Sequence, residues 1–117
     1  MRAIILTKDE QLKSACSNIA QSLNIDWVFE SEVPEFLLGL QTTDYRLIMF
    51  DCERCPQHFL KWLEHIIHLR PKIPVIPVCT QVKREIGAQM MNLGVYYIAQ
   101  KPLDENTISS ILSKMQQ

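Results

Sequence analysis

The sequence predicts an α/β fold in which five parallel strands form an open, doubly wound sheet with helices on both faces. Three observations support this prediction. Apolar runs of strand length alternate with helix-like segments five times, three of these runs are almost continuously apolar, and 117 residues are too few for an eight-stranded barrel. Because strands buried on both faces need helices on both sides, we expect a three-layer sandwich with right-handed crossovers.

The predicted strands are short apolar runs bounded by polar residues. They cover residues 2–7, 26–30, 46–50, 73–79 and 95–99. The first, third and fourth runs have the almost unbroken apolar character of strands covered on both faces. Pro77 lies inside the fourth run, where it would remove a ladder hydrogen bond, so we expect a local bulge there.

Helical spacing of apolar residues fills the segments between the strands. The most regular helix begins near Lys8 or Asp9 and ends at Asn24. Gly94 is suited to the left-handed position that ends a helix. The other four helices are expected at residues 34–40, 56–70, 82–93 and 104–115.

The composition indicates one globular domain over residues 1–117. The chain is 47% hydrophobic and 21% charged, with only 3 glycines, which is typical of a packed core. The net charge of -1 gives no overall field toward nucleic acid or an anionic membrane, so we expect neither partner. The apolar segments are too short for a membrane span or a signal peptide, and we expect a cytoplasmic protein.

Reactive side chains follow the predicted strands at one edge of the sheet. Asp9 follows the first strand, Asp51 the third and Lys101 the fifth, while Cys79 and Thr80 end the fourth. Ligands of open parallel sheets bind beyond the carboxyl ends of the strands. Two carboxylates and a lysine can hold Mg²⁺ and pair with a transferred phosphoryl group, and a carboxylate can itself be the nucleophile.

With these residues, the chain resembles over its whole length the receiver domain of two-component response regulators. The matching segments are Ile4-Ile5-Leu6-Thr7-Lys8-Asp9-Glu10, Leu47-Ile48-Met49-Phe50-Asp51, Ile73-Pro74-Val75-Ile76 and Gly94 followed by Lys101-Pro102-Leu103. The resemblance implies a flavodoxin-like sheet of order 2-1-3-4-5. It also implies a signalling domain rather than an enzyme, with at most self-catalysed phosphorylation and dephosphorylation of its aspartate.

The resemblance assigns roles to the residues of this edge. Asp51 would accept a phosphoryl group from a histidine kinase, and Lys101 would contact the phosphoryl oxygens. The hydroxyl position of the family falls on Cys79, or on Thr80 if the strand bulges at Pro77. The partners would be a histidine kinase or another signalling protein, a homodimer would form through the fourth helix, fifth strand and fifth helix, and the output would include transcription regulation.

The resemblance also implies a metal site. Asp9, Asp51 and the backbone carbonyl of Glu53 would bind Mg²⁺. The first acid of the family's acidic pair falls on Lys8, however, which places an ammonium where a carboxylate normally helps to hold the cation. We therefore expect Mg²⁺ binding to be weak or absent, and we expect Lys8 to pair with Asp51 and to occupy the space of the metal.

Two other interpretations stay open. The aliphatic Ile98 takes the family's switch-aromatic position, which together with Lys8 favours a phosphorylation-independent pseudo-receiver that acts as a protein-interaction module. Cys52-x-x-Cys55 is also typical of small redox or metal proteins, although a structural zinc site needs four ligands. The cysteines otherwise suit reduced thiols. They are Cys16, Cys52, Cys55 and Cys79.

Overall fold

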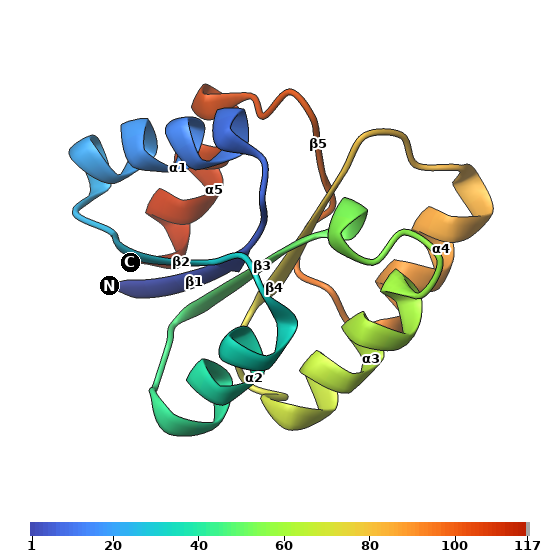
Figure 1. Ribbon diagram of the computed structural model, residues 1–117. Coiled ribbons are helices and arrows are strands. Elements are labelled where there is room, and N and C mark those ends of the chain that lie inside the picture. Colours follow the sequence, from blue (N-terminus) through green and yellow to red (C-terminus); the bar gives the residue numbers. More distant parts are fainter. Residues whose placement is uncertain (117) are drawn as a thin grey trace.

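A computed structural model describes residues 1–116 as one five-stranded sheet flanked by helices (Figure 1). The sheet order is β2-β1-β3-β4-β5, and every paired strand is parallel to its neighbour. The predicted fold class and strand order are therefore confirmed. The strands are β1 (Arg2–Leu6), β2 (Asp26–Glu30), β3 (Leu47–Asp51), β4 (Val75–Cys79) and β5 (Ala99–Gln100).

Helices cover both faces of this sheet. In Figure 1, α1 and α5 lie together on one side of the strands, and α2, α3 and α4 lie on the other. Within residues 1–116, no helix is long and apolar enough to cross a membrane. The helices are α1 (Glu10–Leu23), α2 (Val33–Thr42), the short 3₁₀ helix η1 (Cys52–Arg54), α3 (Phe59–Leu69), α4 (Arg84–Leu93) and α5 (Glu105–Met115).

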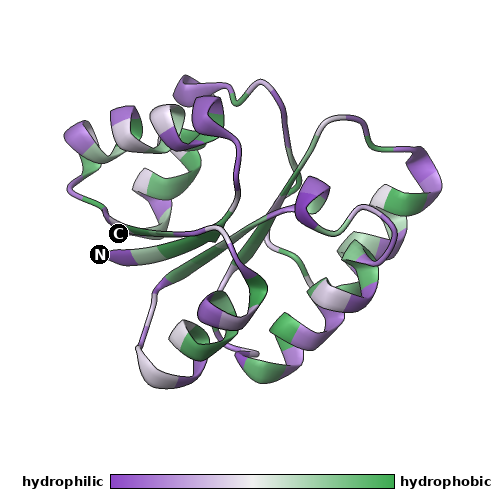
Figure 2. Ribbon diagram, in the orientation of Figure 1, coloured by the Kyte–Doolittle hydropathy of each residue, from purple (hydrophilic) through white to green (hydrophobic). Residues whose placement is uncertain are grey.

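The alternation of side chains along each strand divides the interior into two cores. Along β3, Ile48 and Phe50 belong to the core under α2, α3 and α4, whereas Leu47 and Met49 belong to the core under α1 and α5. Figure 2 shows largely apolar strands between helices that are polar only in part. Neighbouring residues of one strand end therefore face opposite sides of the sheet, and this places the functional side chains described below.

The ends of the helices follow from capping residues visible in the sequence. The Asp9 carboxylate accepts hydrogen bonds from the backbone N–H groups of Gln11 and Leu12, so it is the N-cap of α1. Gly94 ends α4 with φ of 103°, a left-handed conformation that glycine adopts without strain. Both ends agree with the sequence predictions.

The bulge expected at Pro77 is wrong. The pairing of β3 with β4 continues without a slip through Phe50 and Pro77 to Asp51 and Val78. The carbonyl groups of Val75 and Cys79 accept hydrogen bonds from the N–H groups of Tyr96 and Lys101, on the β5 side. The backbone groups of every second strand residue point the same way, so those of residue 77 also face β5. The missing N–H of Pro77 therefore interrupts the ladder toward β5 and leaves the β3 ladder intact.

The same interruption explains why the fifth strand is shorter than predicted. Residues 95–99 were expected as strand, but β5 contains only Ala99–Gln100, and the segment before it bonds to β4 through the Tyr96 N–H and the Val75 carbonyl, 2.8 Å apart. The helices α3 and α4 also begin later than predicted, at Phe59 and Arg84. In the first case η1 occupies the turn after β3, which the sequence analysis did not predict.

Candidate functional site

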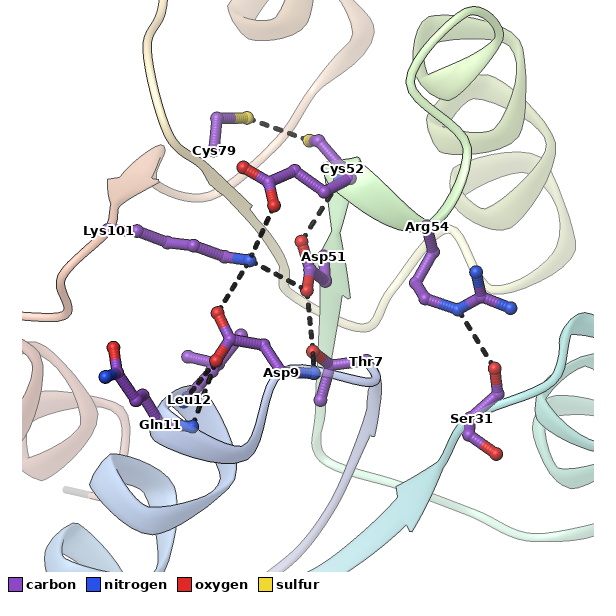
Figure 3. Close-up of polar contacts among 11 residues, drawn as sticks. Thr7, Asp9, Gln11, Leu12, Ser31, Asp51, Cys52, Arg54, Cys79 and Lys101 are labelled. Atoms are coloured by element: carbon purple, nitrogen blue, oxygen red, sulfur yellow. Dashed lines mark hydrogen bonds and ion pairs between the residues drawn. The ribbon is translucent and has the colours of Figure 1, made fainter.

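The structure brings the predicted edge residues into one cluster around the ammonium of Lys101 (Figure 3). Lys101 Nζ lies 2.9 Å from Asp9 Oδ2 and 3.0 Å from Asp51 Oδ2. It also lies 3.3 Å from Glu53 Oε2. We call these four side chains, Lys101, Asp9, Asp51 and Glu53, the lysine cluster. Three carboxylates from the ends of β1 and β3 thus share one ammonium from the end of β5.

Asp51 is the most enclosed member of the lysine cluster. The residue is 2% exposed, and its Oδ2 accepts hydrogen bonds from Lys101 and from the hydroxyl of Thr7, 2.6 Å away. Its other oxygen, Oδ1, accepts from the backbone N–H of Glu53 at 3.0 Å. These donors satisfy a buried carboxylate that would otherwise be costly to remove from water.

Thr7 is the contact that sequence reasoning missed. It is fully buried, its hydroxyl donates to Asp51, and the same oxygen accepts from the backbone N–H of Asp9 at 3.0 Å. A signal was present, because Thr7 is the polar residue that ends an otherwise apolar run. The strand period also places residue 7 on the same face as residues 3 and 5, which pack under α1 and α5, and this is the face of the lysine cluster.

The charges of the lysine cluster stabilise one another. The hydrogen bond from Lys101 lowers the pKa of Asp9 below its usual value of 3.8. Burial alone would lower the pKa of Lys101, but its hydrogen bonds to Asp9 and Asp51 outweigh that effect and raise it. Asp9 and Lys101 are therefore both charged at neutral pH, and Lys101 acts as an internal cation.

The expected position of Lys8 is wrong. Its ammonium pairs with Glu32 Oε1 at 3.3 Å, its side chain is 57% exposed, and it does not reach Asp51. Arg54 holds the other oxygen of Glu32 at 3.6 Å and donates to the Ser31 carbonyl at 2.9 Å. Lys8 follows Thr7 on the alternating chain, so its side chain leaves the site on the opposite side.

The carboxylates do not fit a magnesium ion in this arrangement, because Lys101 Nζ already occupies the point on which they converge. Asp9 Oδ1 is used in addition by the cap of α1. Among residues 1–116, no three His, Cys, Asp or Glu side chains form a group suited to a metal ion. The ammonium on which the three carboxylates converge is thus that of Lys101, and Lys8, which was expected there, pairs with Glu32 instead.

The structure separates the remaining two predicted residues, Cys79 and Thr80. Cys79 is buried and its sulfur lies 2.8 Å from the sulfur of Cys52, on the α3 and α4 side of the sheet. Thr80 is exposed and lines a surface hollow of about 500 Å³ together with Asp9, Glu53 and Lys101. Without the bulge at Pro77, Thr80 is not brought into the fourth-strand position, which Cys79 keeps.

The chain has the fold of response-regulator receiver domains. It aligns with a response regulator from Thermotoga maritima at a TM-score of 0.86 and 13% identity, over 97% of this chain and 95% of that one. A CheY-like receiver domain protein from Methanospirillum hungatei aligns at a TM-score of 0.82 and 20% identity, over 98% of this chain and 93% of that one. The chemotaxis response regulator CheY4 of Vibrio cholerae aligns at a TM-score of 0.81 and 13% identity, over 97% of each chain. No family model matches the sequence, and no curated protein does.

Proposed function

We propose that the chain is a receiver-type signalling domain, which passes a signal to other proteins through a conformational change centred on Asp51 and Lys101. The observation that carries this proposal is the contact of 3.0 Å between Lys101 Nζ and Asp51 Oδ2 at the carboxyl edge of a receiver-type sheet. A histidine kinase or another signalling protein is the expected partner, since the proteins that share this fold include response regulators.

The lysine cluster favours a domain that signals without phosphorylation. Asp51 already accepts hydrogen bonds on both oxygens and is 2% exposed. Lys101 supplies the positive charge that a bound cation would supply in the same place, and the first acid of the family's pair is replaced by Lys8, which turns away to Glu32. Signalling would then depend on a partner that shifts the equilibrium between two arrangements of the lysine cluster.

A phosphoryl-accepting domain is the second candidate, and one observation supports it. Asp51 ends β3 with a lysine ammonium against its Oδ2, the pairing that would place positive charge beside a phosphoryl oxygen. In this version an Asp51 oxygen takes the phosphoryl group from a phosphohistidine of the kinase, so that an acyl phosphate forms and the histidine is released.

Titration with beryllofluoride in the presence of Mg²⁺, followed by amide NMR, distinguishes the two candidates. We expect no saturable shift around Asp51. A saturable shift that disappears in the Asp51→Asn variant would establish the phosphoryl-accepting candidate instead. Thr42→Asn, on the exposed end of α2, is the matched control and should behave as the unchanged protein does.

The signalling proposal itself is tested by a response far from the substitution. Asp51→Asn removes one carboxylate charge from the lysine cluster, and we expect amide resonances of α4 and of the segment before β5 to shift. Shifts confined to residues that touch Asp51 would contradict the proposal. The homodimer through α4, β5 and α5 stays a prediction, with Met91 and Tyr96 as exposed side chains on that face, 53% and 46% accessible.

A further inference from the structure

A pair of cysteines lies directly behind the lysine cluster, on the other face of the sheet. Cys52 and Cys79 are 5% and 4% exposed, and their sulfur atoms lie 2.8 Å apart. Figure 3 shows the two thiols pointing toward each other from the ends of β3 and β4. The CxxC pattern had drawn attention to Cys55, but the sulfur that meets Cys52 belongs to a residue 27 positions away.

The backbone geometry of this pair suits a disulfide. Asp51 and Val78 are paired in register, and the next residues are Cys52, the first residue of η1, and Cys79, the last residue of β4. Adjacent parallel strands lie about 4.8 Å apart. Disulfides join Cα atoms that are roughly 4.4–6.8 Å apart. The pairing of the residues just before them, together with the 2.8 Å between the two sulfur atoms, therefore suits a disulfide without separation of β3 from β4.

The thiols also have a route to a small reagent. Both cysteines line a surface hollow of about 150 Å³, together with Phe59, Val82, Ile86 and Met90. Glu53, Thr80 and Gln81 add polar groups to this lining, and the small volume admits a compact molecule such as hydrogen peroxide more readily than a peptide disulfide. Cys16, in contrast, belongs to α1 and is fully buried, and the sulfur of Cys55 has no thiol partner among the described residues.

We propose that Cys52 and Cys79 form an oxidisable dithiol, a modification site that hydrogen peroxide converts into a disulfide between the ends of β3 and β4. One sulfur attacks the O–O bond and becomes a sulfenic acid, while the departing hydroxide takes the thiol proton to form water. The second sulfur then attacks the sulfenic sulfur, its proton joins the departing hydroxyl as a second water, and the S–S bond forms. The protein loses two electrons and the peroxide gains them.

The disulfide would act on the neighbouring lysine cluster through the backbone. Cys52 lies between Asp51 and Glu53, and the Glu53 N–H donates to Asp51 Oδ1 at 3.0 Å. A bond from Cys52 to β4 therefore fixes the segment that supplies one of the three hydrogen bonds of Asp51. The modification would make the surroundings of Asp51 depend on the redox state, whether or not Asp51 is phosphorylated.

Peptide mapping of the full chain tests the site, because trypsin separates all of the cysteines. Cleavage after lysine and arginine places Cys52 in peptide 47–54, Cys55 in 55–61 and Cys79 in 73–83. After hydrogen peroxide treatment and blocking of free thiols, we expect peptide 47–54 linked to 73–83 with the loss of two hydrogens. A thiol assay in denaturant should fall from four thiols to two and return to four after dithiothreitol.

Matched single substitutions complete the test. Cys55→Ser should keep the linked peptide and Cys79→Ser should abolish it, while circular dichroism checks that each variant is folded. A link from 47–54 to 55–61 would assign the redox chemistry to the CxxC pattern and overturn the proposal. Four titratable thiols after prolonged peroxide treatment of the unchanged protein would also overturn it, as would sulfinic acid at Cys52 or Cys79 without a link.

Discussion

The lysine cluster and the Cys52–Cys79 pair begin at consecutive residues of one strand end, yet they are opposite kinds of environment. Asp51 faces α1 and α5 and meets Thr7 and Lys101, whereas Cys52 faces α3 and α4 and lies in the apolar core with its sulfur against that of Cys79. The first site depends on charge and the second on proximity in an apolar core. The comparison shows how the two-residue period of a strand can place two chemistries back to back.

The largest effect that we expect is the loss of folding stability when the charge of the lysine cluster is removed. Lys101→Met removes the ammonium shared by three carboxylates and leaves the Asp51 carboxylate buried without its ionic partner. Breaking a buried pair in this way costs about 3–5 kcal/mol. Urea unfolding measures the loss, and Lys72→Met, at an exposed position between α3 and β4, is the control expected to change stability by less than about 0.5 kcal/mol. Equal losses in the two variants would show that Lys101 is not an internal cation.

The sequence predicted which residues lie at the carboxyl edge of the sheet but not which of those side chains pair with one another. Strand ends are marked by a change from apolar to polar residues, so Asp9, Asp51 and Lys101 could be assigned to one edge before the structure was known. Which ammonium enters the site depends on side-chain direction within a turn. Lys8 and Lys101 have the same chemistry, and only the fold shows that Lys8 turns to Glu32 and Lys101 to Asp51.

The same limit applies to the thiols and to Pro77. Cys52 and Cys55 stand out because they are close in sequence, whereas the contact of Cys52 with Cys79 depends on the register between β3 and β4. The effect of Pro77 depends on which neighbour its missing N–H would have faced. These are contacts between distant parts of the chain, and local composition does not specify them.

Thr7 tests the hydrogen bonding of Asp51 separately from its charge. Thr7→Val keeps the shape of the side chain and removes the donor that lies 2.6 Å from Asp51 Oδ2. A hydrogen bond to a charged group is worth about 1.5–3 kcal/mol, and we expect a loss of that size in urea unfolding. Thr42→Val is the control, since the Thr42 hydroxyl donates to the Leu38 carbonyl at an exposed position. A loss no larger than in the control would mean that Lys101 alone satisfies Asp51.

The pH dependence of stability should identify the lysine cluster as the charged one of the two sites. The pKa of Asp9 is lowered in the folded state, so its contribution is present above its usual value of 3.8 and is lost as the pH falls through the lowered value. The pKa of Lys101 is raised, so its contribution is present below its usual value of 10.5 and is lost as the pH rises through the raised value. We expect urea unfolding at a series of pH values to show both losses, and Lys101→Met to flatten them. A profile unchanged by that substitution would contradict the assignment.

The smallest effect is expected for Lys8, and it distinguishes the two lysines most directly. Lys8 and Glu32 form an exposed pair, with side chains 57% and 55% accessible, and such pairs contribute about 0–1 kcal/mol. Lys8→Asp should therefore change stability little and should leave Mg²⁺ affinity, measured by calorimetric titration, as weak as in the unchanged protein. If Lys8→Asp instead raised the affinity tenfold or more, a side chain at position 8 would have to reach the site in solution, and Lys101 would not be sufficient to keep the ion out.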